Sequence, residues 1–272
     1  MQNTKIRNFF GQVGRATHSF FDYTGHLVRL FSHVLNWSWR MCFRGGKVIR
    51  RETFFNQMVV MGVGSVPIIC LVGISVGTVL ALQAAYQLKQ FGAVMYTGSL
   101  VSVSMARELG PLIASIVVAG RVGARIAAEL GSMKVQEEVD ALTTMAIDPI
   151  RFLVLPRCLA LFFMLPCLTI IADAIGMAGG FLIGVTSLGI EPYLYIEKNF
   201  DALVLKDLYT GLAKSGAFAL IIGLVSCFQG LAVEGGAEGV GRATTQAVVD
   251  SIVLIIVADC VFTAIFYYAF PS

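Results

Sequence analysis

The sequence is short of charged residues and lacks the motifs of several common enzyme classes. Only 14% of its 272 residues are charged and 57% are hydrophobic, whereas soluble domains are about a quarter charged. No GxxxxGK[ST] phosphate-binding loop, HExxH motif or GxSxG motif occurs in the chain. The sequence therefore excludes a Walker-type ATP site and gives little support to a membrane enzyme. The composition predicts an integral membrane protein.

Patterns typical of metal sites and disulfide frameworks are also missing. None of the six cysteines belongs to a CxxC pair, and all three histidines lie in the N-terminal segment (His18, His26 and His33). We interpret the cysteines as small buried hydrophobic residues. We predict no metal site, no cofactor and no catalytic residue.

Five stretches are apolar enough and long enough to cross a membrane, which takes about 20 residues. They cover residues 59–82, 93–128, 153–187, 208–231 and 247–270. We expect Pro67 to kink the first, and residues 107–111 to interrupt the second. The third is long enough to be tilted, or broken near Pro166 or Asp173. The predicted fold class is an all-α integral membrane protein of about five transmembrane helices.

The N-terminal segment, residues 1–52, is basic and rich in aromatic residues. Residues 5–51 contain nine Lys or Arg and one acid, Asp22. A nucleic-acid-binding arm would also be basic, but the interleaved aromatic and aliphatic residues favour a helix lying at an anionic membrane surface. Residues 53–272 then form one transmembrane domain. Basic residues also gather in residues 121–157, so we expect the N-terminus and the 129–151 loop to be cytoplasmic.

The 131–148 segment reads GSMKVQEEVDALTTMAID. Val135, Val139, Leu142 and Ala146 recur at helical spacing, and Pro149 is expected to end the element. The segment predicts a short amphipathic helix between two spans. By periodicity alone, an interfacial connector and a helix that docks into a soluble partner are equally supported.

Arg107 and Glu108 lie inside an apolar stretch and are followed by Gly110 and Pro111. Charges at membrane depth usually pair or face a polar cavity. Alternatively, the helix begins at the membrane surface there; both interpretations place the two residues near lipid phosphates. The other acids in or beside spans are Asp173, Asp250 and Asp259. Because no His or Lys is spaced nearby on the same helix, we expect packing or helix-end hydrogen bonds for them.

One long stretch resembles a known family. Residues 107–157 read RELGPLIASIVVAGRVGARIAAELGSMKVQEEVDALTTMAIDPIRFLVLPR, and the similarity extends to GRATTQAVVDS at 241–251 and to Asp259-xxx-Thr263. These segments closely resemble the MlaE (YrbE) family, the permeases of Mla-type phospholipid ABC transporters. The resemblance covers most of the chain from about residue 50 onward.

The resemblance implies a homodimeric permease in the cell inner membrane. Its partners would be a cytoplasmic ABC ATPase subunit and a periplasmic MCE-domain protein. It would move phospholipids, or related lipids, between membranes and so maintain outer-membrane lipid asymmetry. No nucleic-acid partner is implied.

The resemblance also nominates site residues. Residues 131–148 would be the coupling helix, with ATPase contacts at Glu129, Glu137, Glu138, Asp140, Asp148 and Pro149. The lipid pocket would lie at the dimer interface and contain Leu80, Ala84, Gln87, Leu88, Phe91, Arg107 and Glu108. An apolar wall suits acyl chains, and Arg107 can pair with a phosphate.

Two alternatives remain. A secondary transporter or channel working alone would use Arg107, Glu108 and Asp173 as an ion or proton path. A membrane anchor for a soluble complex would tolerate substitutions in the proposed pocket, such as Leu88→Arg.

Overall fold

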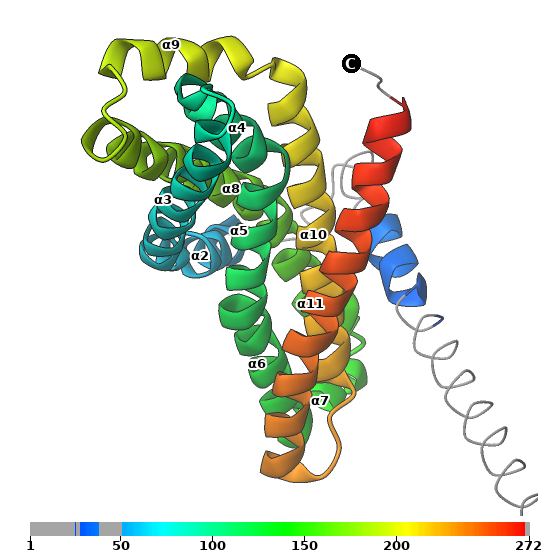
Figure 1. The fold of residues 1–272 in the computed structure, drawn as a ribbon. Coiled ribbons are helices and arrows are strands. Elements are labelled where there is room, and N and C mark those ends of the chain that lie inside the picture. The colour runs from blue at the N-terminus through cyan, green and yellow to red at the C-terminus, as the bar shows by residue number, and fades with distance from the viewer. Residues whose placement is uncertain (1–24, 26–27, 38–50, 270–272) are drawn as a thin grey trace, which may run out of the picture.

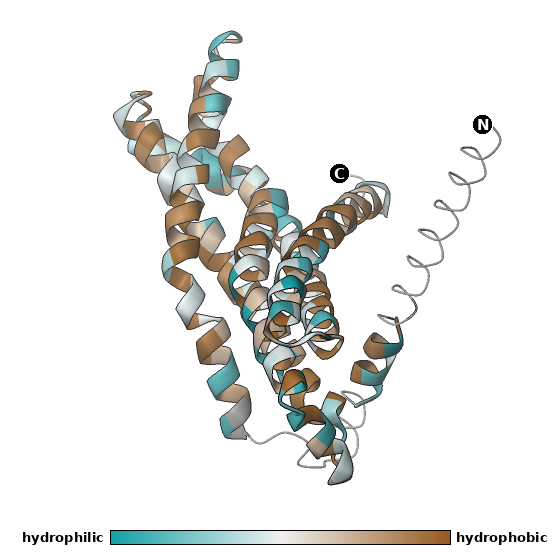
Figure 2. Cartoon of the chain, turned by 90° about the horizontal axis from the view of Figure 1, so that it is seen from below, coloured by the Kyte–Doolittle hydropathy of each residue, from teal (hydrophilic) through white to brown (hydrophobic). Residues whose placement is uncertain are grey.

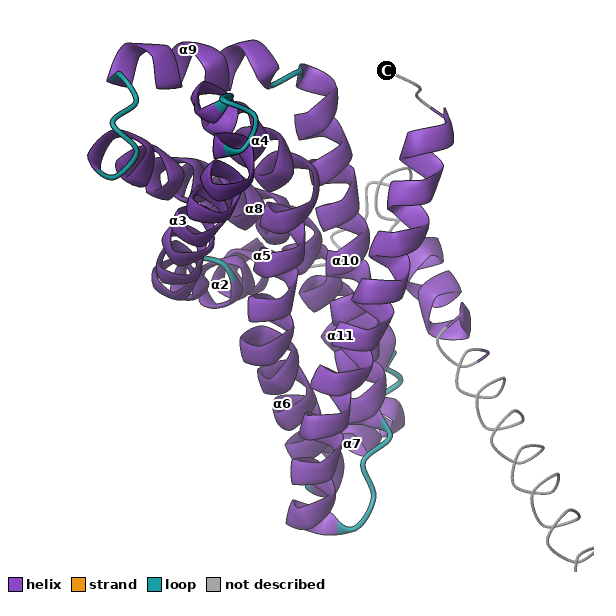
Figure 3. Ribbon diagram, viewed as in Figure 1, coloured by secondary structure: helices purple, strands orange, loops and turns teal. Residues whose placement is uncertain are grey.

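The computed structural model describes residue 25, residues 28–37 and residues 51–269, and all the regular structure in these ranges is helical (Figures 1 and 3). The described residues contain five helical stretches long and apolar enough to cross a membrane: Phe54–Lys89, Val94–Val135, Ile150–Thr186, Leu205–Leu231 and Gly236–Tyr268. The predicted fold class and number of spans are confirmed. Of the predicted basic segment 1–52, the structure describes residue 25, a helix over 28–37 and residues 51–52; the rest lies outside the described residues.

The spans are assembled from shorter helices. The first contains α2 (Arg51–Met61), the 3₁₀ turn Val63–Ser65 and α3 (Val66–Lys89). The second contains the 3₁₀ turn Val94–Tyr96, α4 (Thr97–Ser104), the π turn η3 (Met105–Leu109), α5 (Gly110–Val118), the π turn η4 (Ala119–Gly123) and α6 (Ala124–Val135). After α7 (Glu138–Thr144), the third contains the π turn η5 (Ile150–Val154) and α8 (Leu155–Thr186). Then follow α9 (Pro192–Ala202), α10 (Leu205–Leu231) and α11 (Gly236–Ala269).

Proline explains two of the interruptions. Pro67 lies in the first turn of α3, directly after the 3₁₀ turn, where its missing N–H costs nothing. Pro111 lies in the first turn of α5, and its ring would clash with the carbonyl of Arg107 in a regular helix. The π turn η3 avoids that clash, and the N–H of Gly110 bonds to Met105 O instead. The break considered near Pro166 or Asp173 is absent, since α8 runs through both residues.

The spans pack through small residues. α3 lies along α8, and a Cβ on Gly77 would overlap the carbonyl of Gly176. The absent side chains let the two backbones approach closely, as membrane helices commonly do. The outer faces of the long helices are apolar as well (Figure 2), and Val253, Val257 and Val261 of α11 are each about half exposed.

The two ends of the bundle differ. α9 crosses one end, where the C-terminal end of α11 also lies, while α7 and the turn between α10 and α11 lie at the other end (Figure 1). α9 is anchored by Tyr195, which is buried against Gly180 and Gly184 of α8. Burial raises the pKa of Tyr195 to about 12, so its phenol stays neutral in the physiological range.

The prediction of a single helix over residues 131–148 is wrong, because two helices share this segment. α6 ends at Val135, and α7 begins only after Glu137, whose φ of 60° is left-handed and therefore ends regular helix. Val139 is buried and Leu142 packs against the core, so these two form the inward face of α7. A turn at Ala146, with φ 58°, follows α7, and Pro149 begins the next helix instead of ending this one.

Candidate functional site

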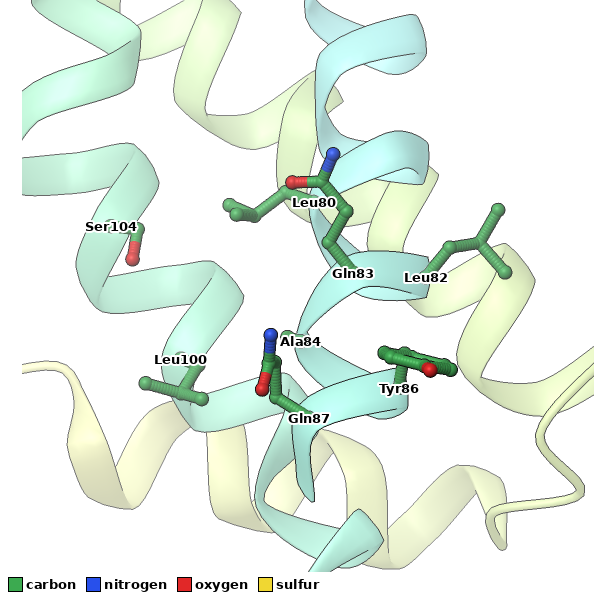
Figure 4. Close-up of a pocket in the computed structure, with 8 residues that line it drawn as sticks. All are labelled: Leu80, Leu82, Gln83, Ala84, Tyr86, Gln87, Leu100 and Ser104. Atoms are coloured by element: carbon green, nitrogen blue, oxygen red, sulfur yellow. The ribbon is translucent and has the colours of Figure 1, made fainter. Parts of the chain in front are cut away.

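An apolar groove of about 530 Å³ lies between α3 and α4 (Figure 4). Leu80, Ala84 and Gln87, spaced by four and three residues, project from α3 toward Leu100 and Ser104 of α4. This spacing places the three side chains on one face of the helix. Three of the predicted lipid-pocket residues therefore meet in one groove.

Two other predicted pocket residues do not line this groove. Leu88 is half-buried at the end of α3, and Phe91 lies beyond that end, with 80% of its surface exposed. Helical periodicity explains the difference for Leu88: it follows Gln87 by one residue and so points about 100° away from it.

Arg107 and Glu108 line a second, separate pocket of about 360 Å³. Its other walls come from α10 and α11: Lys206, Asp207, Thr210 and Lys214 from the first, and Thr263, Phe266, Tyr267 and Tyr268 from the second. Within the single chain, the residues predicted for one lipid pocket therefore line two separate pockets. The two pockets are neighbours along the chain: Ser104 lines the first, and Arg107, three residues later, lines the second.

The second pocket is built around an ion network that joins η3 to α10 and α11. Lys214 is only 1% exposed and donates hydrogen bonds to Glu108, to Asp259 at 2.9 Å and to Thr263 at 2.7 Å. Thr263 Oγ1 also donates to Glu108 Oε1 at 3.1 Å. One buried ammonium is thus held by two carboxylates and a hydroxyl from two other helices, which satisfies its three donors.

Arg107 forms the neighbouring ion pair. Its Nε lies 2.6 Å from Asp207 Oδ1, and the Asp207 side chain is 2% exposed. The Arg107 side chain is 47% exposed, so part of its guanidinium faces the pocket. Close approach of α10 helps the pairing, since a Cβ on Gly211 would overlap the carbonyl of Ala106 in η3.

Neither Lys214 nor Asp207 was predicted as a site residue from the sequence. For Asp259 only packing or helix-end hydrogen bonds were expected, because no basic residue is spaced nearby on its own helix. The partner lies 45 residues away, on α10. The available signal was Lys214 itself, which is the single charged residue of the predicted span 208–231.

The two remaining intramembrane acids differ from Asp259. Asp250 accepts hydrogen bonds of 2.7 Å from the amides of Gln229 and Gln246. Asp173 is buried, and its Oδ1 has no hydrogen-bond partner and lies against Gly110. Neither joins the Arg107–Glu108 pocket, so the structure does not connect Asp173 to the ion path considered from the sequence.

The six predicted coupling residues fall into two groups. Glu137, Glu138 and Asp140 are exposed at α7, where Asp140 pairs with Lys134 at 2.9 Å. The other three are held within the chain. Glu129 pairs with Arg125 at 2.6 Å and with Arg157 at 3.4 Å.

Asp148 and Pro149 belong to this second group because they start the next helix. Asp148 Oδ1 accepts a 2.9 Å hydrogen bond from the backbone N–H of Ile150, and Asp148 Oδ2 accepts one of 3.0 Å from Trp37 Nε1. Asp148 therefore positions the chain at this point.

Comparison with known proteins shows to which family this chain belongs. Residues 54–265 match the family model described as Permease MlaE. The chain belongs to the MlaE permease family. It is 42% identical over 224 residues to a probable ABC transporter permease protein of Rickettsia bellii, covering 81% of this chain and 86% of that protein. A probable ABC transporter permease protein of Synechocystis is 38% identical over 231 residues, covering 85% and 84%.

A plant relative extends the comparison. The chloroplastic protein TRIGALACTOSYLDIACYLGLYCEROL 1 of Arabidopsis thaliana is 37% identical over 222 residues, which cover 82% of this chain and 63% of that protein. The MlaE permease matches, together with the five apolar spans, identify the chain as a multi-pass membrane permease of the ABC transporter type. ATP hydrolysis in such a transporter belongs to an ATPase partner.

Proposed function

We propose that this MlaE-family permease moves phospholipids, or related lipids, between the cell inner membrane and a periplasmic MCE-domain protein, and so maintains outer-membrane lipid asymmetry. It would act as a homodimer with a cytoplasmic N-terminus. The name of the Arabidopsis relative, which is that of a glycolipid, supports a lipid substrate.

The observation that carries the proposal is the adjacency of an apolar groove and a charged pocket. The α3–α4 groove suits acyl chains, and three residues farther along the chain the half-exposed guanidinium of Arg107 suits a phosphate. A phospholipid has both an apolar and an anionic part. Asp207 holds Arg107 in place, so the cation is positioned before lipid arrives.

Coupling to ATP hydrolysis would use the short helix α7. Its exposed acids Glu138 and Asp140 lie at the end of the bundle away from α9 (Figure 1). Val139 and Leu142 join α7 to the core, so a push on α7 reaches the spans directly. We propose that the ATPase contacts α7 through these acids, whereas Glu129, Asp148 and Pro149 hold the surrounding chain in position.

The test is purification of the detergent-solubilised complex from its own membranes, with mass spectrometry of proteins and lipids. We expect an ATPase, an MCE-domain protein and phospholipid. Glu138→Lys should lose the ATPase and keep the lipid, while Ala84→Arg should lose the lipid and keep the ATPase. Loss of both components from either variant would contradict the separation of the two sites; purification without any ATPase or lipid would overturn the proposal.

The buried ion network favours one alternative, a transporter that works alone. Lys214, Glu108 and Asp259 are groups of the kind that carry ions through membranes. That alternative predicts transport in proteoliposomes without ATP and with a strong pH dependence. Our proposal predicts that lipid transfer stops when the catalytic glutamate of the co-purified ATPase is replaced.

A further inference from the structure

The N-terminal helix over residues 28–37 is docked on the bundle. Val34 is 4% exposed, and Leu30 and Trp37 pack against the same core, so the three residues form one apolar face at helical spacing. Trp37 is held at the end of the helix by its 3.0 Å hydrogen bond to Asp148. The Arg151 guanidinium also lies over the Trp37 ring, 5.1 Å from its centroid.

The docked helix leaves a groove of about 310 Å³ beside it. One wall carries Arg29 and His33 from the helix, and the other is apolar, with Ile150, Phe228 and Leu231. Among the described residues that line it, none is acidic. The groove is separate from both pockets described above, with which it shares no residue.

The apolar wall indicates the level of this groove relative to the membrane. Ile150 is the first residue of one apolar span and Leu231 is the last residue of the next. The groove therefore lies where two apolar spans end. Because spans cross the hydrocarbon core between their ends, we place this end of the bundle at the level of lipid headgroups. Trp37 beside it is also the residue type preferred at that level. A cationic wall and an apolar wall at this depth match the headgroup phosphate and the upper acyl chain of a phospholipid.

We infer that this groove is a binding site for an anionic phospholipid of the surrounding membrane, with its headgroup at Arg29 and His33 and a chain along Phe228 and Leu231. The charge of the segment favours an anionic lipid over a zwitterionic one, because residues 5–51 contain nine Lys or Arg and one acid. The ligand would hold the N-terminal helix at its place beside Asp148.

Trp37 provides a direct reporter. The chain has two tryptophans, Trp37 and Trp39, so Trp39→Phe leaves Trp37 as the sole indole of this chain, and the same complex with Trp37→Phe as well gives the background to subtract. The full-length permease, with whatever partners co-purify, is placed in phosphatidylcholine nanodiscs that contain a minor fraction of phosphatidylglycerol. Bromine atoms, which quench tryptophan, are attached to the acyl chains of one lipid or the other.

We expect brominated phosphatidylglycerol to quench Trp37 at a lower mole fraction than brominated phosphatidylcholine. A single basic residue near a membrane surface changes affinity for anionic lipid about fivefold, so Arg29→Gln should lower the preference about fivefold and Arg29→Gln with His33→Gln should lower it further. The matched control is Arg242→Gln, which removes an exposed arginine of α11 outside the groove and should keep the preference.

Three results would overturn the inference. The first is equal quenching by the two brominated lipids in the parent protein, which needs no groove variant and so does not depend on how those variants fold. The second is an equal loss of preference in Arg242→Gln, which would mean attraction by overall surface charge. The third is displacement of phosphatidylglycerol by inorganic phosphate, which would make the groove a site for free anions.

Discussion

Replacing Lys214 with methionine tests the ion network most directly. The substitution keeps the length of the side chain and removes its charge, and Glu108 and Asp259 then face each other without a cation. Breaking a buried ion pair by removing one partner costs about 3–5 kcal/mol. Glu108 is 37% exposed and Asp259 20%, so neither anion is fully buried and we expect the lower figure, about 3 kcal/mol.

A loss of that size is measurable as a shift in melting temperature. For a chain of this length, 1 kcal/mol corresponds to about 2–4 °C, so Lys214→Met should melt about 6–12 °C below the parent protein. A thiol-reactive fluorescent dye suits the measurement once the exposed Cys167 and Cys260 and the partly exposed Cys70 are replaced by alanine in every variant, because Cys158 and Cys227 are buried and become reactive when the fold opens. The free energy of unfolding in mixed detergent micelles gives an independent value.

Two comparisons sharpen the result. Lys198→Met removes a cation whose 3.7 Å pair with Asp201 lies near the surface of α9, and it should cost no more than about 1 kcal/mol. Adding Glu108→Gln and Asp259→Asn to Lys214→Met removes the unpaired anions, so most of the lost stability should return. The reasoning is refuted if Lys214→Met is as stable as Lys198→Met, or if the triple variant is no more stable than Lys214→Met alone.

Three further predictions concern packing and backbone strain, and the same melting assay checks them. Gly77→Val should destabilise the chain by about 1–3 kcal/mol, because its Cβ would overlap the carbonyl of Gly176 and push α3 away from α8; an unchanged melting temperature would contradict that close contact. Asp173→Asn should keep or raise stability, since a neutral side chain of the same shape replaces a buried carboxyl whose Oδ1 has no partner; a marked loss would mean that the carboxyl is satisfied. Glu137→Gly should raise stability by about 1 kcal/mol, because glycine adopts the left-handed conformation of this position without strain. Glu138→Gly lies in the regular helix α7 and should lower stability by about the same amount. Equal effects at both positions would argue against the break between α6 and α7.

The sequence by itself determined the membrane class, the five spans and the family. Hydropathy along the chain suffices for the spans, because in a bilayer each helix must satisfy its own backbone hydrogen bonds and show an apolar surface over about 20 residues. The grouping of Leu80, Ala84 and Gln87 was also predictable, since residues on one helix face follow from the 3.6-residue period. These properties depend only on neighbours along the chain.

Tertiary structure alone decided which charges meet and how many pockets there are. Lys214 pairs with Glu108 and Asp259 from two other helices, and Asp148 binds Trp37 across 111 residues. Such pairs depend on the rotation and separation of packed helices, which side-chain contacts set and which periodicity within one helix cannot supply. Packing against α10 and α11 likewise places Arg107 and Glu108 in the second pocket, although Ser104, three residues before Arg107, lines the α3–α4 groove.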